Sequence, residues 1–144
     1  MAGSVAKPST HAYRGPVRRL RVAVSDGTWR VVKEMRVERM SVRAHWSPPE
    51  GRGLEVGNYV EVIDSEGRVL HRQPVRDPLD TSIEIFERGR ISRVDTKREI
   101  LLDILAPEPK KARRVRLVAH GRDLPLAEGK KKPHTRGFEL PALK

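Results

Sequence analysis

The sequence predicts an all-β protein, an antiparallel sandwich of about seven to eight strands with flexible basic termini. Two observations lead to this fold class. Between residues 17 and 120, apolar side chains repeatedly alternate with other side chains, as they do in strands that bury one face. Turn-forming residues separate these segments at nearly regular intervals, which is typical of sandwiches and barrels.

The clearest local signal is a β-hairpin at residues 58–75. Its two arms, 59–63 and 69–75, both contain apolar residues, and the four residues between the arms favour turns. Gly67 can take the positive φ that a tight reversal needs. We expect the remaining strands to pack around this hairpin.

Two strands joined by a tight turn are predicted before the hairpin. Leu20, Val22 and Val24 alternate with arginine and alanine residues, and the Asp-Gly pair within 25–28 is typical of hairpin loops. The following segment, 29–40, fits a strand, although its apolar residues also fit the spacing of an α-helix. Its valines and the preceding turn favour the strand.

Further strands are predicted on both sides of the hairpin. Residues 42–46 alternate again, and the proline- and glycine-rich stretch 47–57 is predicted to be a loop. Four more alternating segments follow, at 83–86, 91–94, 100–105 and 115–119. The side chains predicted to form the core are Val22, Val60, Val62, Ile85, Leu102, Ile104 and Leu117.

One stretch resembles a known family of modules. The order of Trp46, Pro48 and Pro49 before Tyr59 resembles the passage between two strands of fibronectin type III modules. The hairpin that continues through 76–78 is similar to small immunoglobulin-like sandwiches of bacterial proteins. The resemblance covers about residues 17–120 and lacks the immunoglobulin cysteine pair. It implies an immunoglobulin-like sandwich that binds or spaces other components, although a shared fold does not carry function by itself.

The net charge of +11 is concentrated at the two ends of the 144-residue chain. Residues 1–24 carry five basic and no acidic residues, 25–105 carry 14 basic and 15 acidic, and 106–144 carry 11 basic and four acidic. We therefore expect a disordered basic arm at 1–16, a β-sandwich domain at 17–121 and a basic Pro/Lys-containing tail at 122–144. The sandwich should fold without the two terminal parts.

Enzymatic activity is not predicted. The sequence has no cysteine, which excludes thiol nucleophiles, disulfides and thiolate metal sites. It lacks the common phosphate-binding, dinucleotide-binding, serine-hydrolase and zinc-protease motifs, and its five histidines are scattered. Asp77 with Asp80, and Asp64 with Glu66, are interpreted as turn caps rather than as catalytic or calcium-binding groups. We therefore expect no catalytic residue, no metal site and no cofactor.

Ten basic residues are candidates for contact with a polyanion or a partner protein. They are Arg19, Arg21, Lys110, Lys111, Arg113, Arg114, Arg116, Lys130, Lys131 and Lys132. In strands, Arg19 and Arg21 share one face, as do Arg114 and Arg116, so two strands would each present an arginine stripe. The alternative is that these charges are solvated and only keep the protein soluble.

These features predict a non-enzymatic interaction or structural module that mediates protein–protein contacts in a larger assembly, with the basic ends as anchoring arms. The alternative function is non-specific binding of nucleic acid through phosphate contacts of the same basic residues. No apolar run approaches the roughly 18 residues of a membrane helix. No secretory signal is visible in the first twenty residues, so a cytoplasmic location is expected.

Overall fold

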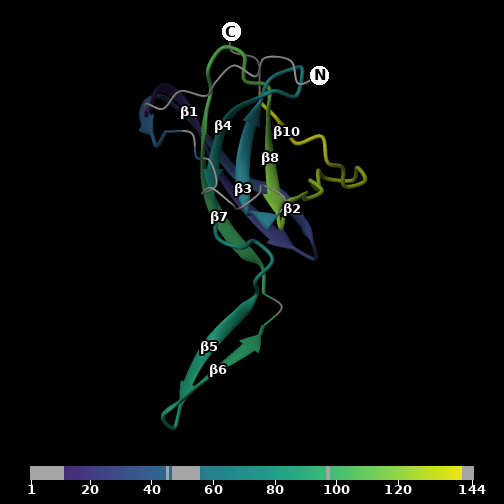
Figure 1. The fold of residues 1–144 in the computed structure, drawn as a ribbon. Coiled ribbons are helices and arrows are strands. Elements are labelled where there is room, and N and C mark those ends of the chain that lie inside the picture. Colours follow the sequence, from purple (N-terminus) through teal and green to yellow (C-terminus); the bar gives the residue numbers. More distant parts are fainter. Residues whose placement is uncertain (1–11, 45, 47–55, 97, 141–144) are drawn as a thin grey trace.

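The computed structural model of the chain describes residues 12–44, 46, 56–96 and 98–140. These residues form ten β-strands and no α-helix, and all pairs of named strands are antiparallel (Figure 1). The strands are β1 (Tyr13–Ser25), β2 (Thr28–Val42), β3 (Tyr59–Ile63), β4 (Val69–Pro74), β5 (Ser82–Glu87), β6 (Arg90–Asp95), β7 (Ile100–Pro107), β8 (Arg114–Ala119), β9 (Arg122–Asp123) and β10 (Phe138–Glu139). The predicted all-β fold is confirmed.

Two of the sheets share one apolar core. The three-stranded sheet has the order β2-β1-β7, and the five-stranded sheet has the order β10-β8-β3-β4 with β9 beside β8. Leu20 and Val22 of β1 belong to the same buried cluster as Val60 and Val62 of β3 and Leu117 of β8. Because side chains alternate along a strand, the residues between these point away from the core.

The residues of its turn explain why the long β1–β2 hairpin forms. Ser25 pairs with Thr28, which leaves Asp26 and Gly27 as a two-residue loop with φ values of 53° and 74°. A two-residue turn whose twist matches that of the flanking strands requires a positive φ at both residues, and the Asp-Gly pair meets this requirement. Residues 28–42 continue as one strand, so the strand prediction for 29–40 is confirmed and the helical alternative is wrong.

The predicted core is largely correct. Val22, Val60, Val62, Ile104 and Leu117 are buried, and Leu102 is half-buried and packs against the same cluster. Ile85 is the error, because it lies in β5, outside the buried cluster. Its alternating pattern is that of a strand, but β6 is the only partner of β5 among the described strands.

The C-terminal segment differs from the expectation of a tail without a role in the core. Leu124, Leu126 and Leu140 are buried members of the core cluster. Residues 124–127 run beside Trp29 of β2, whose backbone N–H donates to the carbonyl of Pro125 at 3.0 Å. The Trp29 indole Nε1 donates to the carbonyl of Leu124 at 3.0 Å. The packed structure therefore extends beyond residue 121, at least to Leu140.

The N-terminal expectation overlaps the described residues only in part. Residues 1–11 of the expected arm lie outside them, whereas residues 13–16 are already part of β1. Most of the predicted loop 47–57 also lies outside them, including both prolines of the family-like stretch.

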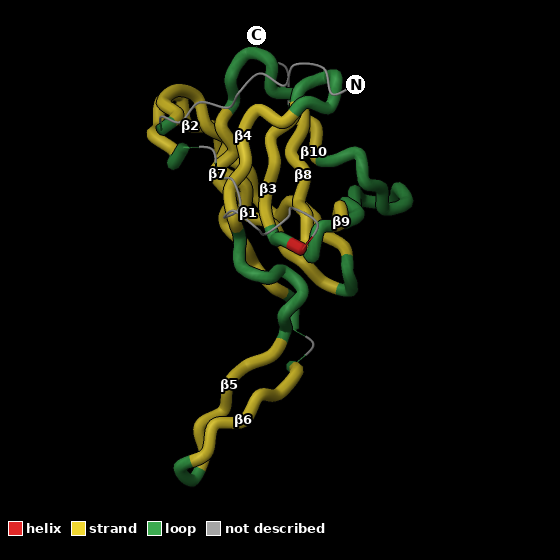
Figure 2. The backbone as a smooth tube through the Cα atoms, viewed as in Figure 1, coloured by secondary structure: helices red, strands yellow, loops and turns green. Residues whose placement is uncertain are grey.

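The β5–β6 pair, called here the projecting hairpin (residues 82–95), is separate from the two larger sheets. Its strands pair only with each other among the described strands. Figures 1 and 2 show it extending from one end of the body, joined to it by the segments before β5 and after β6. An isolated two-stranded hairpin is at best marginally stable in water, which makes this element unusual.

Candidate interaction surfaces

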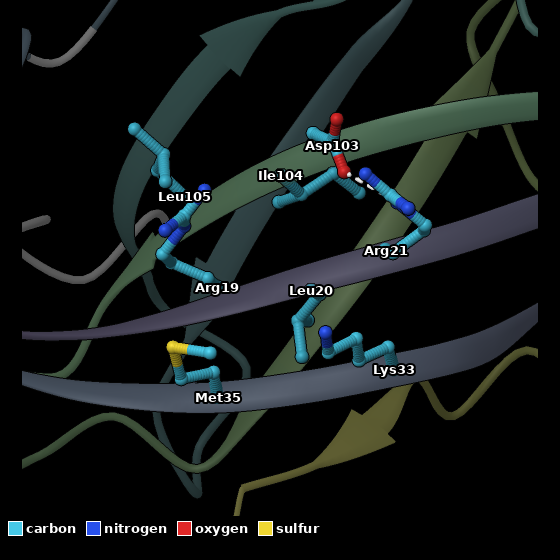
Figure 3. Close-up of a pocket in the computed structure, with 8 residues that line it drawn as sticks. All are labelled: Arg19, Leu20, Arg21, Lys33, Met35, Asp103, Ile104 and Leu105. Carbon is cyan, nitrogen blue, oxygen red and sulfur yellow. Dashed lines mark hydrogen bonds and ion pairs between the residues drawn. The ribbon is translucent and has the colours of Figure 1, made fainter.

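The first candidate surface is a groove on the outer face of the three-stranded sheet (Figure 3). It encloses a volume of about 160 Å³, and we call it the cationic groove. Its walls are formed by Arg19 and Arg21 of β1, Lys33 and Met35 of β2, and Asp103 and Leu105 of β7. The register explains this composition, because Arg19 lies between Met35 and Leu105, and Arg21 lies between Lys33 and Asp103.

The charges of the cationic groove are only partly neutralised. Arg21 Nε donates to Asp103 Oδ1 at 3.1 Å, and this pair is exposed. Arg19 and Lys33 form no ion pair with any residue in the described part of the chain. The two long strands that bear them, residues 13–42, carry eight basic and three acidic residues. The groove is therefore a cationic surface with apolar side chains within it.

The second predicted arginine stripe lies on the outer face of the other sheet. Glu61 of β3 stands between Arg72 of β4 and Arg116 of β8 and is 4% exposed. Its Oε2 accepts from Arg72 Nη2 at 2.7 Å, and its Oε1 accepts from Arg116 Nη2 at 2.9 Å. Arg116 is thus ion-paired with Glu61 and 25% exposed, and Arg114 on the same strand is half-buried. The two stripes do not form one surface.

The other predicted contact residues lie in loops. Lys110 and Lys111 are exposed in the turn between β7 and β8, and Arg113 Nη1 donates to the carbonyl of Lys110 at 2.8 Å. Lys130, Lys131 and Lys132 are exposed in the segment between β9 and β10. Of the predicted contact residues, Arg19 and Arg21 therefore line the cationic groove, and the structure adds Lys33 to them.

The second candidate surface is the projecting hairpin. Phe86 is 74% exposed and pairs across the strands with Ile91, which is 68% exposed. Ile83 pairs with Val94 on the opposite face, so apolar side chains lie on both faces. Among residues 82–95, three acidic residues balance three basic ones, so this element is neutral while the whole chain carries +11.

Sequence reasoning missed Lys33, Phe86 and Ile91 as candidate contact residues. Lys33 reaches the groove because a β-bulge between Arg21 and Val22 shifts the register with β2, and no sequence signal marks that bulge. For Phe86 a sequence signal was present, because this large aromatic residue lies between the two charged residues Glu84 and Glu87. The alternating pattern of this segment does not show whether another sheet covers the strand.

Two groups with shifted pKa values, His71 and Asp64, take part in local hydrogen bonds. Burial lowers the pKa of His71, and its Nε2 lies 2.9 Å from the carbonyl oxygen of Arg43. Burial alone would raise the pKa of Asp64, but hydrogen bonds from Arg68 and from the Glu66 N–H outweigh it and lower that pKa. The carboxylate is thereby used in its own turn, as predicted for a turn cap.

No group of three or more metal-ligating side chains is present among the described residues. The described part of the chain also has no helix that could cross a membrane.

The fold and the two surfaces define an all-β protein with two antiparallel sheets around one core, a cationic groove and a projecting hairpin. No family model, no curated protein and no solved structure matches the chain. The function therefore has to be argued from the surfaces themselves.

Proposed function

We propose that this protein is a non-enzymatic interaction module that mediates protein–protein contacts in a larger assembly through its projecting hairpin. The observation that carries the proposal is the exposure of Phe86 and Ile91 on an element that pairs with none of the other described sheets. Exposed apolar side chains grouped in this way mark interaction sites, whereas single ones are ordinary. A partner that covers the hairpin supplies the apolar contacts that an isolated two-stranded element lacks.

The basic ends have a secondary role in this proposal. The exposed lysines Lys130, Lys131 and Lys132 anchor the module by attraction to acidic groups of the assembly, while the neutral hairpin provides the specific contact. We place this module in the cytoplasm.

We also infer that the two sheets form an immunoglobulin-like sandwich. The order β10-β8-β3-β4 corresponds to the G-F-C-C′ order of variable-type immunoglobulin sheets, and β1 pairs with β7 as strand B pairs with strand E. In that correspondence β2 occupies the edge position of strand A, and the projecting hairpin stands in the chain where strand D is expected. The module is thus a sandwich in which one strand position is replaced by an external hairpin.

Comparative co-purification from a native lysate tests the proposed function. The wild type is compared with a Phe86→Ser, Ile91→Ser variant, and Val32→Ser serves as the matched control because Val32 is also exposed but lies on β2. We expect a protein that is retained by the wild type and the control and lost by the hairpin variant. Identical sets of retained proteins for all three would refute the role of the hairpin.

A second function, non-specific binding of nucleic acid, is favoured by one observation: in the cationic groove, Arg19 and Lys33 have no ion pair with any described residue. Such binding has a Kd of roughly 10⁻⁴ to 10⁻⁶ M near physiological salt. If about five phosphates are neutralised, log K should fall with log salt at a slope of about −4.5. Fluorescence anisotropy with a labelled oligonucleotide measures this slope. An Arg19→Gln, Lys33→Gln variant should flatten it, and an unchanged slope would exclude the groove as the site.

A further inference from the structure

The projecting hairpin and the cationic groove carry complementary groups. On one face of the hairpin, Glu84 and Phe86 lie side by side in β5, because residues two apart in a strand point the same way. Glu84 forms no ion pair with a described residue, and Ile91 stands opposite Phe86. This face therefore offers the Glu84 carboxylate, which has no ion pair among the described residues and stands opposite Arg93, next to an exposed aromatic ring.

The groove offers the matching chemistry. Arg19 has no ion pair among the described residues, and its strand neighbours on the two sides are the apolar residues Met35 and Leu105. In Figure 3 the Arg19 side chain reaches toward Leu105, whereas Arg21 is turned toward Asp103. Met35 is 48% exposed and forms an apolar wall of the groove. A partner that places a carboxylate at Arg19 and an aromatic ring over Met35 would form an ion pair and an apolar contact at the same time.

We propose that the projecting hairpin of one copy of this protein docks in the cationic groove of a second copy. Glu84 pairs with Arg19, and Phe86 packs on Met35 and Leu105. The inference rests on the proposed function of the hairpin and names its partner as another molecule of the same chain. Charge complementarity favours this occupant, because the hairpin presents the Glu84 carboxylate on the same face as Phe86, while Arg93, opposite Glu84, has its Nη2 3.9 Å from Asp80 Oδ2.

The contact has to form between copies. The hairpin extends away from the body, and the groove lies on the flat outer face of the three-stranded sheet (Figures 1 and 3). A hairpin that points away cannot lie on the sheet of its own molecule. The hairpin of one copy then contacts the groove of the next. If the rotation that relates successive copies closes, the product is a reciprocal dimer or a ring, and if it does not close, the copies form an open series.

Analytical ultracentrifugation of the purified full chain tests the inference directly. Over a range from about 1 μM to about 1 mM, which covers weak association, the average mass should rise, either to a dimer or through a series. Phe86→Ser should weaken the association at least about tenfold, as expected for an aromatic anchor. A single monomer mass across the whole range would overturn the inference.

A double-mutant cycle tests the specific pairing. Arg19→Gln and Glu84→Gln should each weaken association about twofold to fivefold at low salt. The double variant should associate no more weakly than the single variant with the lower affinity, because the second change removes a contact that is already lost. Fully additive effects would overturn the Glu84–Arg19 contact. Arg43→Gln removes the same charge from an exposed residue just after β2 and should leave association unchanged. An equal loss in that variant would reveal a general charge effect and overturn the pairing.

The two proposals fail in distinguishable ways. A chain that is monomeric at every concentration but still loses a different protein from the lysate on Phe86→Ser retains the proposed function and lacks the self-contact. A chain that loses no protein from the lysate but associates with itself retains the self-contact as the only role of the hairpin. Association that an oligonucleotide abolishes while the Phe86 variant leaves it intact would place the groove with nucleic acid and overturn the inference.

Discussion

Truncating Leu126 to alanine tests whether the C-terminal segment is part of the core. The side chain is 1% exposed and belongs to the buried cluster. The backbone on both sides is fixed, because Ala127 N donates to the carbonyl of Trp29 at 2.7 Å and Leu126 N donates to the carbonyl of His134 at 2.6 Å. The site cannot easily collapse around the smaller side chain, so the cavity should persist.

The expected cost is therefore about 3–5 kcal/mol, the upper part of the range for buried leucine-to-alanine changes. Total stabilities are about 5–15 kcal/mol, so this is a large fraction. For a chain of this size, each kcal/mol corresponds to a shift in Tm of about 2–4 °C. Urea unfolding followed by tryptophan fluorescence, to which Trp29 beside the segment and Trp46 both contribute, measures the free energy of unfolding.

The matched control is Leu101→Ala, the same change on the outer face of β7, where the side chain is 59% exposed. It should alter stability by no more than about 0.5 kcal/mol. A Leu126→Ala variant as stable as this control would refute the reasoning that places 124–127 in the core. A chain ending at Gly121 should fail to fold cooperatively, since it loses three buried leucines and the partners of Trp29.

Four further outcomes are expected. Because burial lowers the pKa of His71 below 6.5, only the unfolded state gains a proton as the pH falls through that value, so stability should decline from about pH 7 towards about pH 5. Thermal melts of His71→Gln should lack this decline; an equal decline in the variant would assign it to other groups. Asp64→Ala should cost about 1–3 kcal/mol in urea unfolding through the loss of charged hydrogen bonds in its turn, whereas the exposed Glu66→Ala should cost much less. Glu61→Gln should cost about 3–5 kcal/mol in the same assay, because it leaves two largely buried arginines without their carboxylate, and a cost below about 1 kcal/mol would contradict that account. Phe86→Ser should leave the Tm of the body unchanged within about 2 °C, as the hairpin is outside the core, and a larger fall would place it inside.

Local patterns predicted the eight longer strands and the turns of their hairpins. The strand predicted at 42–46 is wrong, because β2 ends at Val42, and the two-residue strands β9 and β10 were not predicted. The alternation at Leu20, Val22 and Val24 reflects a strand with one buried face, and the Asp-Gly pair imposes the two-residue turn that joins β1 to β2. The same alternation at Ile83 and Ile85 led to a wrong core assignment. A strand pattern indicates the pleat of the backbone but not whether a second layer exists to cover it.

The groove and the C-terminal packing depend on contacts between distant parts of the chain. Arg19 meets Leu105 through the β1–β7 pairing, and Lys33 enters the groove through a bulge. Leu124 and Leu126 were too few for a periodic pattern, yet two leucines beside one tryptophan suffice when backbone hydrogen bonds hold them there. Such short segments gain their structure from the sheet that they join, and composition alone does not reveal it.

The placement of residues 124–127 beside Trp29 also affects the time course of folding. The residues of β7 that pair with the central strand β1 lie 76 to 90 positions later in the chain. The indole of Trp29 donates its hydrogen bond to Leu124, which lies later still. Proteins dominated by such non-local pairings fold in milliseconds to seconds, much more slowly than helical bundles. During synthesis, a chain that stops before Leu124 would present an uncovered tryptophan and an unpaired strand edge. Such features expose incomplete chains to aggregation and are the surfaces that chaperones bind.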